Sequence, residues 1–139
     1  MTSALSQPVR RFLEERRFAV IATVNEDGSP QQAVVWYLVG DDGDTLIINS
    51  AEGRRWPTNL RRDQRISLAV EDGLEWVSVN GVVEIVDDHA QSQADIAAMA
   101  RLNDPPEVAE RSIRNQFERQ RRVSFRLRPT RIHAELAGG

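Results

Sequence analysis

Short apolar runs rich in β-branched residues, separated by turn-forming stretches, dominate the first third of the chain. Clusters of Gly, Asp, Asn and Ser, which favour tight turns, lie between these runs. This arrangement predicts three consecutive antiparallel strands joined as a meander. The three runs occupy residues 18–24, 31–39 and 45–49.

The second half of the chain shows the same signals. Between Glu75 and Val86, apolar and polar residues alternate with the period of a strand, and Val77, Val79, Val83 and Ile85 share one face. Gly81 interrupts that face and indicates a bulge or a barrel corner. Further strands are predicted at 66–70, at 121–129 and, as a short seventh strand, at 132–136. In the run 121–129, Val123, Phe125 and Leu127 point one way, and Arg122, Ser124, Arg126 and Arg128 point the other.

Helical spacing and helix boundary signals predict four helices. An amphipathic helix is expected from Pro8 to Arg17, with Val9, Phe12 and Leu13 on its apolar face. A second, arginine-rich helix begins near 53–56, because Pro57 is tolerated only in the first turn. Late in the chain, Asp87 and Asp88 cap an alanine-rich helix that is expected to run to about Leu102. Asp104-Pro105-Pro106 ends this helix, and a further helix is predicted to carry Ile113 and Phe117.

Together these elements predict a mainly β (α+β) fold. Six to seven antiparallel strands, a short inserted helix and a late helical pair fit a closed or split β-barrel better than a sandwich. A chain of 139 residues has the length of one domain, so residues 1–139 are expected to form a single split barrel.

Composition excludes several kinds of chemistry. The chain has no cysteine, which rules out disulfides, cysteine-ligated metals and thiolate nucleophiles. All 18 basic residues are arginine, so a lysine Schiff base is excluded as well. The net charge of −3 is typical of soluble proteins and unlike that of strongly basic nucleic-acid binders. No stretch approaches the roughly 20 apolar residues of a membrane helix, so we expect a cytoplasmic protein with no membrane partner.

The densest polar cluster runs from Ser50 to Arg62 and surrounds the predicted helix start. A helix N-terminus with free N–H groups, two arginines and a serine hydroxyl suits a phosphate group. From the spacing alone, however, a solvated basic helix is the better interpretation. Helical geometry also places Arg54 and Arg61 on a different face from Arg55 and Arg62, so at most two or three of these groups can hold one phosphate.

Other candidate residues give weaker signals. Aromatic rings such as those of Trp36, Trp56 and Trp76 stack on planar heterocycles, although buried tryptophans more often belong to a core. His89 and His133 have no partner at metal-ligand spacing, so no metal site is predicted. No glycine-rich phosphate loop and no nucleophile motif is present, and we assign no catalytic residue.

Three segments carry a resemblance to a known family: 18–39, 53–72 and 76–88. They resemble the pyridoxamine 5'-phosphate oxidase-like FMN-binding split β-barrel family. The run RRWPTNLRRDQR at 54–65 is the most specific part and is similar to the branch of F420-dependent (deazaflavin) oxidoreductases.

The resemblance implies a homodimer with the cofactor in a groove at the interface, coenzyme F420 as the cofactor, and FMN as the alternative. It also implies that the helix start holds the cofactor phosphate and that the strand after the first hairpin lies along the ring. Some members have a lysine near the position of Trp56, and Arg55 is expected to supply that charge here. The implied cofactor-binding residues are Val34, Val35, Trp36, Ser50, Arg54, Arg55, Trp56, Asn59, Arg61 and Trp76.

The resulting functional hypothesis is an F420-dependent oxidoreductase that reduces a small conjugated or unsaturated acceptor. An FMN-dependent oxidase or reductase of the same fold is the first alternative. A non-catalytic flavin carrier or sensor is the second. A barrel that binds single-stranded nucleic acid through arginines and tryptophans is a third, and the acidic net charge argues against it.

Overall fold

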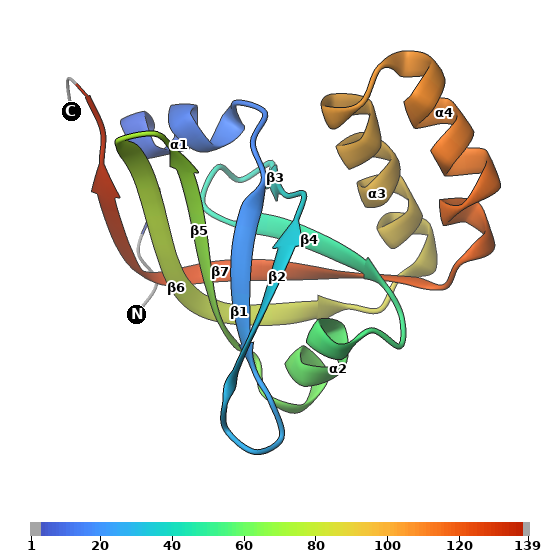
Figure 1. Ribbon diagram of the computed structural model, residues 1–139, viewed down its shortest axis with the longest axis horizontal. Helices are drawn as coiled ribbons and strands as arrows, with labels where there is room; N and C mark the ends of the chain where they lie inside the picture. The colour runs from blue at the N-terminus through green and yellow to red at the C-terminus, as the bar shows by residue number, and fades with distance from the viewer. Residues whose placement is uncertain (1–3, 138–139) are drawn as a thin grey trace.

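The structure is a computed structural model that describes residues 4–137. Its centre is a seven-stranded sheet in the order β2-β1-β5-β6-β7-β4-β3, in which every neighbouring pair is antiparallel (Figure 1). The edge strands β2 and β3 are not hydrogen-bonded neighbours, so the curved sheet is a split barrel, as predicted. The strands are β1 (Ala19–Val24), β2 (Pro30–Val35), β3 (Leu38–Val39), β4 (Leu46–Ala51), β5 (Arg65–Asp72), β6 (Glu75–Val86) and β7 (Arg122–Glu135).

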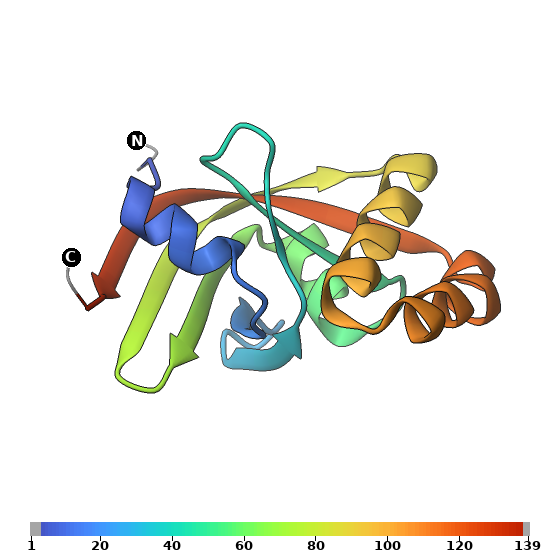
Figure 2. The same cartoon turned by 90° about the horizontal axis from the view of Figure 1, so that it is seen from above.

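Four α-helices and one short 3₁₀ helix accompany the sheet in the described part of the chain. Figures 1 and 2 show α1 on one side of the molecule and the packed pair α3 and α4 on the other. The short helix α2 is inserted between β4 and β5, as the position of Pro57 predicted. The helices are α1 (Gln7–Glu14), α2 (Arg55–Arg62), α3 (His89–Asn103), α4 (Pro106–Asn115) and η1 (Phe117–Arg119).

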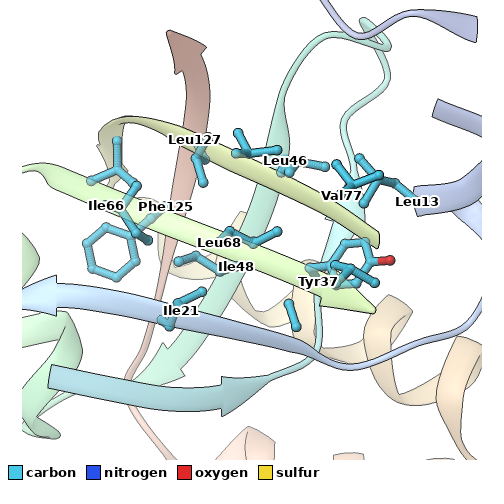
Figure 3. Close-up of a cluster of buried hydrophobic side chains, with 14 of the residues drawn as sticks. Leu13, Ile21, Tyr37, Leu46, Ile48, Ile66, Leu68, Val77, Phe125 and Leu127 are labelled. Carbon is cyan, nitrogen blue, oxygen red and sulfur yellow. The ribbon is translucent and has the colours of Figure 1, made fainter. Parts of the chain in front are cut away.

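The predicted apolar faces form the core. Val77 and Val79 of β6 are fully buried, and Val9, Phe12 and Leu13 anchor α1 over the barrel. Inside the barrel, aliphatic side chains from β1, β4 and β5 meet Phe125 and Leu127 of β7 (Figure 3). A second, smaller cluster lies between α3, α4 and η1, so the helical pair has a hydrophobic core of its own.

The bulge indicated by Gly81 is present. The register between β6 and β7 shifts between Asn80 and Gly81. A Cβ atom at Gly81 would lie 2.3 Å from the carbonyl oxygen of Arg128, so only glycine allows this approach of the two backbones. Pro129 is paired with Gly81, where the disrupted ladder tolerates a residue without an N–H group.

The prediction of one strand over 31–39 and of a three-stranded meander was wrong. Strand β2 ends at Val35, and Leu38–Val39 forms β3, which pairs with β4. Strand β4 then pairs with β7 rather than with β2. The physical reason is that the barrel is split at this point. Tyr37 turns into the core, whereas Trp36 packs against the cluster between α3, α4 and η1, so the chain crosses from the sheet edge at β2 to the edge at β3.

Two late elements also differ from expectation. The strands predicted at 121–129 and 132–136 form one continuous strand, β7, because the bulge at Gly81 accommodates Pro129. Phe117 lies in η1, just after the end of α4. Helix α3 begins after Asp88, whose side chain accepts a hydrogen bond from the Gln91 N–H, as the capping signal predicted.

Candidate functional site

The start of α2 is a helix end without a side-chain cap. Gly53, with a φ of 90°, turns the chain out of β4, and Arg54 occupies the N-cap position without a capping hydrogen bond. The first N–H groups of the helix, those of Arg55 and Trp56, have no side-chain acceptor within residues 4–137. These donors and the positive end of the helix dipole favour an anion at this point.

A hollow of about 360 Å³ lies beside this helix start. We call it the α2 pocket. Arg55 is exposed and forms no ion pair within the described residues, so its charge is available to a ligand. Arg62 donates hydrogen bonds to the Val24 carbonyl and the Asn59 side chain. The lining consists of Glu26, Gly53, Arg55, Thr58, Asn59 and Arg62.

A second hollow of about 190 Å³ lies between the end of β2, the start of α2 and the hydrophobic cluster of α3, α4 and η1. We call it the inner pocket. Among residues 4–137, its walls combine three aromatic rings with two guanidinium groups, and no acidic side chain lines it. A planar molecule with negative charge matches this lining. The lining residues are Val34, Val35, Trp36, Asn49, Arg54, Trp56, Ile96, Met99, Gln116, Phe117 and Arg122.

Arg122 is the most unusual group in the inner pocket, because it is only 7% exposed. Its Nε donates to Asn49 Oδ1 at 2.9 Å, its Nη1 donates to Gln120 Oε1 at 2.6 Å, and its guanidinium lies 5.0 Å from the ring centre of Phe117. Burial and, second, the positive charge of Arg54 lower the pKa of Arg122 to about 10. The group therefore remains positively charged at neutral pH.

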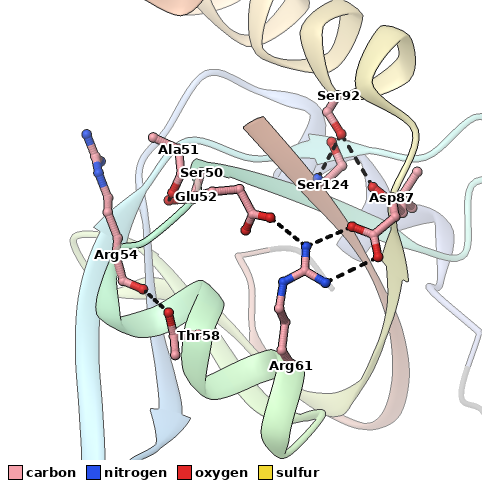
Figure 4. Close-up of polar contacts among 10 residues, drawn as sticks. Ser50, Ala51, Glu52, Arg54, Thr58, Arg61, Asp87, Ser92 and Ser124 are labelled. Carbon is pink, nitrogen blue, oxygen red and sulfur yellow. Dashed lines mark hydrogen bonds and ion pairs between the residues drawn. The ribbon is translucent and has the colours of Figure 1, made fainter. Parts of the chain in front are cut away.

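A buried polar network fixes the wall behind Arg122. Asn49 Nδ2 donates to Ser124 Oγ and to the Ser92 carbonyl, both at 2.9 Å. Ser124 Oγ donates to Asp95 Oδ2 at 2.7 Å. The Ser124 N–H donates to the Ser92 hydroxyl at 3.0 Å (Figure 4). These bonds connect α3 to β4 and β7, so they hold the inner pocket in one shape.

The structure brings most of the candidate residues from the sequence together at these two pockets. Five line the inner pocket: Val34, Val35, Trp36, Arg54 and Trp56. Arg55 and Asn59 line the α2 pocket. The Asn59 amide also donates to Thr23 and Asn25, so it anchors α2 to β1 as well.

Three candidates lie elsewhere. Ser50 is buried in β4, and its hydroxyl donates to the Ala51 carbonyl. Arg61 forms ion pairs of 2.7 Å with Asp87 and Glu52 at the other end of α2 from Arg54 (Figure 4), and hydrogen bonding to these carboxylates raises its pKa. Trp76 is the second residue of β6, beside the β5–β6 turn, and it lines neither the inner pocket nor the α2 pocket.

Several lining residues were missed by the sequence reasoning, notably Asn49, Phe117 and Arg122. The alternation in β7 placed Arg122 and Ser124 correctly on the face opposite Phe125. However, the face is buried at these two positions, because Ser92 and Asp95 of α3 are hydrogen-bonded to Ser124 and the Phe117 ring of η1 lies against Arg122. No local signal reveals this cover, because Ser92 of α3 and Ser124 of β7 are 32 residues apart.

Other features of the described residues give less support for a ligand site. No cluster of three or more His, Cys, Asp or Glu residues is placed to hold a metal, and no helix is long and apolar enough to cross a membrane. A larger hollow of about 440 Å³ lies against β1, β5 and β6. Its described lining has no aromatic residue and only one cationic residue, Arg65, so the two pockets at α2 are the better candidates for a charged planar ligand.

Comparison with known proteins identifies the family. A family model for pyridoxamine 5'-phosphate oxidase matches residues 5–135, whereas comparison with curated proteins gave no match. The fold is similar to that of conserved hypothetical protein Rv2991 from Mycobacterium tuberculosis, at 24% identity and a TM-score of 0.74, over 96% of this chain and 85% of that one.

Two further solved structures share the fold. An F420 reductase is 24% identical, with a TM-score of 0.66, over 89% of this chain and 94% of that one. HutZ, a heme storage protein from Vibrio cholerae, is 20% identical, with a TM-score of 0.68, over 94% of each chain. The family model covers nearly the whole sequence and agrees with the split-barrel topology, so this chain belongs to the pyridoxamine 5'-phosphate oxidase family.

Proposed function

We propose that this chain binds the deazaflavin coenzyme F420 and is an oxidoreductase that reduces a small conjugated or unsaturated acceptor. The observation that carries the proposal is the uncapped start of α2, with Arg54 and Arg55 beside it, next to a pocket walled by Trp36, Trp56 and Phe117. When bound, the coenzyme would supply a hydride from its ring carbon. The similarity to an F420 reductase supports this choice among the cofactors of the family.

The residues present fit such a coenzyme. The N–H groups of the first turn of α2 and the Arg55 side chain suit a phosphate. The half-buried Val35 and Trp36 at the end of β2 offer an apolar edge against which a flat ring system can lie. The same residues fit FMN, so the experiment must distinguish binding of F420 from binding of FMN.

The chain itself would contribute orientation and exclusion of water. The network of Asn49, Ser92 and Ser124 holds the wall of the inner pocket, so an acceptor placed there has little freedom to move. Within the part of the chain that the structure describes, the residues that line this pocket include no carboxylic acid, histidine or hydroxyl group. In this proposal the proton that completes the reduction therefore comes from solvent, and no side chain is assigned as an acid.

We also propose a homodimer with the cofactor groove at its interface, as is typical of the family. Apolar side chains on the outward face of the sheet support it: Val34 is 69% exposed, Val82 43% and Val20 40%. Val20 is paired with both Val34 and Ala69, so the apolar surface continues across three strands. Burying such a surface against a second copy removes it from water. Light scattering of the purified protein should give twice the monomer mass.

The function is tested by fluorescence titration of the apo-protein with oxidised F420 and, in parallel, with FMN. We expect tighter binding of F420. Arg55→Ala should raise the dissociation constant for F420 by about tenfold, since one charge-assisted contact contributes roughly 1.5 kcal/mol. The matched control is Arg111→Ala, which removes an equal charge from an exposed position on α4 and should change nothing.

Each other outcome has a definite meaning. Tighter binding of FMN would assign the chain to the FMN-dependent enzymes. Binding of F420 without turnover of any acceptor in a broad panel would indicate a carrier. Binding of neither cofactor would refute the proposal, and equal loss in the two arginine variants would refute the phosphate site.

A further inference from the structure

A buried guanidinium without an anionic partner lies in the wall of the inner pocket. Buried arginines are ordinarily paired with carboxylates, because an isolated buried charge is costly. Arg122 is 7% exposed, yet within the described residues its side-chain acceptors are the neutral amides of Asn49 and Gln120. Its Nη2 group has no acceptor there, so part of its hydrogen-bonding capacity is unused.

The nearest buried acid does not neutralise Arg122. Asp95 accepts hydrogen bonds from Ser124 Oγ at 2.7 Å and from Gln91 Nε2 at 2.8 Å. It is connected to Arg122 only through Ser124 and Asn49, which are both neutral. This chain of hydrogen bonds polarises the network but leaves the positive charge at the pocket uncompensated.

The surroundings of Arg122 favour a planar carboxylate as the missing partner. Arg54 adds a second positive charge to the same pocket, and none of the described residues that line it is an acid. The flat edge of a guanidinium matches the geometry of a carboxylate. Trp36, Trp56 and Phe117 supply apolar walls for the body of the ligand. A volume of about 190 Å³ equals roughly six water molecules of about 30 Å³ each, which suits a small molecule.

We propose that Arg122, assisted by Arg54, binds a carboxylate on the acceptor, and that the acceptor is therefore a small planar acid. That the ligand is an acceptor rests on the proposed function, whereas the anion site rests on the geometry of the pocket alone. The phosphate of the coenzyme has its own place at the start of α2, where backbone N–H groups and Arg55 are available.

The test is an NMR titration of the apo-protein with cinnamate and with its neutral analogue cinnamamide. We expect cinnamate to bind at least fivefold more tightly. The indole N–H signals of Trp36 and Trp56 should shift, while that of Trp76, which does not line the pocket, should remain in place. The preference for cinnamate should disappear in Arg122→Gln and persist in Arg121→Gln, which removes an exposed charge from the neighbouring position.

A second variant keeps the test decisive if Arg122→Gln does not fold. In Gln120→Glu a carboxylate replaces the amide that already accepts a hydrogen bond from Arg122 at 2.6 Å. The new ion pair should neutralise Arg122 without loss of packing and abolish the preference. Equal binding of the two probes, or an unchanged preference in both variants, would overturn the proposal. Because no coenzyme is present, this failure is distinct from a failure to bind F420.

Discussion

Gly81 provides the most direct test of the barrel geometry, through the substitution Gly81→Ala. The added Cβ would lie 2.3 Å from the carbonyl oxygen of Arg128 and 3.0 Å from Leu127 Cδ2. An unstrained contact between carbon and carbonyl oxygen is about 3.3 Å or longer, so β7 would have to move by about 1 Å. Since β7 is paired with both β4 and β6, this movement would disturb two ladders.

The magnitude follows from two opposing effects. Overpacking costs about 1–3 kcal/mol, and the upper end applies because the obstacle is backbone. Replacing glycine by alanine also restricts the unfolded chain, which stabilises the folded state by up to about 1 kcal/mol. The free energy of unfolding should therefore fall by about 2 kcal/mol, which at roughly 4 °C per kcal/mol for a chain of this size lowers Tm by about 8 °C.

Thermal unfolding followed by circular dichroism measures this shift. The control is Glu84→Ala, an exposed position of the same strand whose surface ion pair with Arg128 contributes little, so the stability should change by only about 0.5 kcal/mol. A Gly81→Ala protein that unfolds at or above the temperature of the unmodified protein would refute the close approach of β6 and β7.

Two further predictions concern buried polar groups. Tyr37 is the only tyrosine of the sequence, and burial raises its pKa to about 12. The absorbance at 295 nm should therefore titrate near pH 12 in the folded protein and near pH 10 in urea. The folded state binds the Tyr37 proton more tightly, so the contribution of Tyr37 to stability should be constant below pH 10 and should decrease between about pH 10 and 12. The difference in unfolding free energy between the unmodified protein and Tyr37→Phe measures this contribution, and a folded-state titration near pH 10 would contradict the burial. Asp95→Ala should lower the free energy of unfolding by about 2 kcal/mol because it leaves Ser124 and Gln91 without their acceptor, whereas the exposed Asp41→Ala should have little effect. Urea denaturation compares the two, and equal midpoints would show that the network contributes nothing.

The candidate site was predictable only where one segment carried the signal. The helix start at Arg54 and Arg55 was found from Pro57, from the arginines and from the family resemblance. Helical spacing also predicted that not all of the arginines can hold one phosphate, and the ion pairs of Arg61 agree with this. The polar wall of the inner pocket was not predictable, because Asn49 and Arg122 are 73 residues apart and meet only through the pairing of β4 with β7.

The sequence by itself determined the local elements. The limits of β6, the apolar face of α1 and the cap of α3 depend on residues within a few positions of one another, so they were predicted from pattern alone. Gly81, which interrupts the apolar face of β6, likewise indicated the bulge. Tertiary structure decided which strands pair, where the run 31–39 breaks, and that α3 and η1 lie over the start of β7. These features depend on the free energy of burying surfaces that are distant in sequence, and no short pattern records that balance.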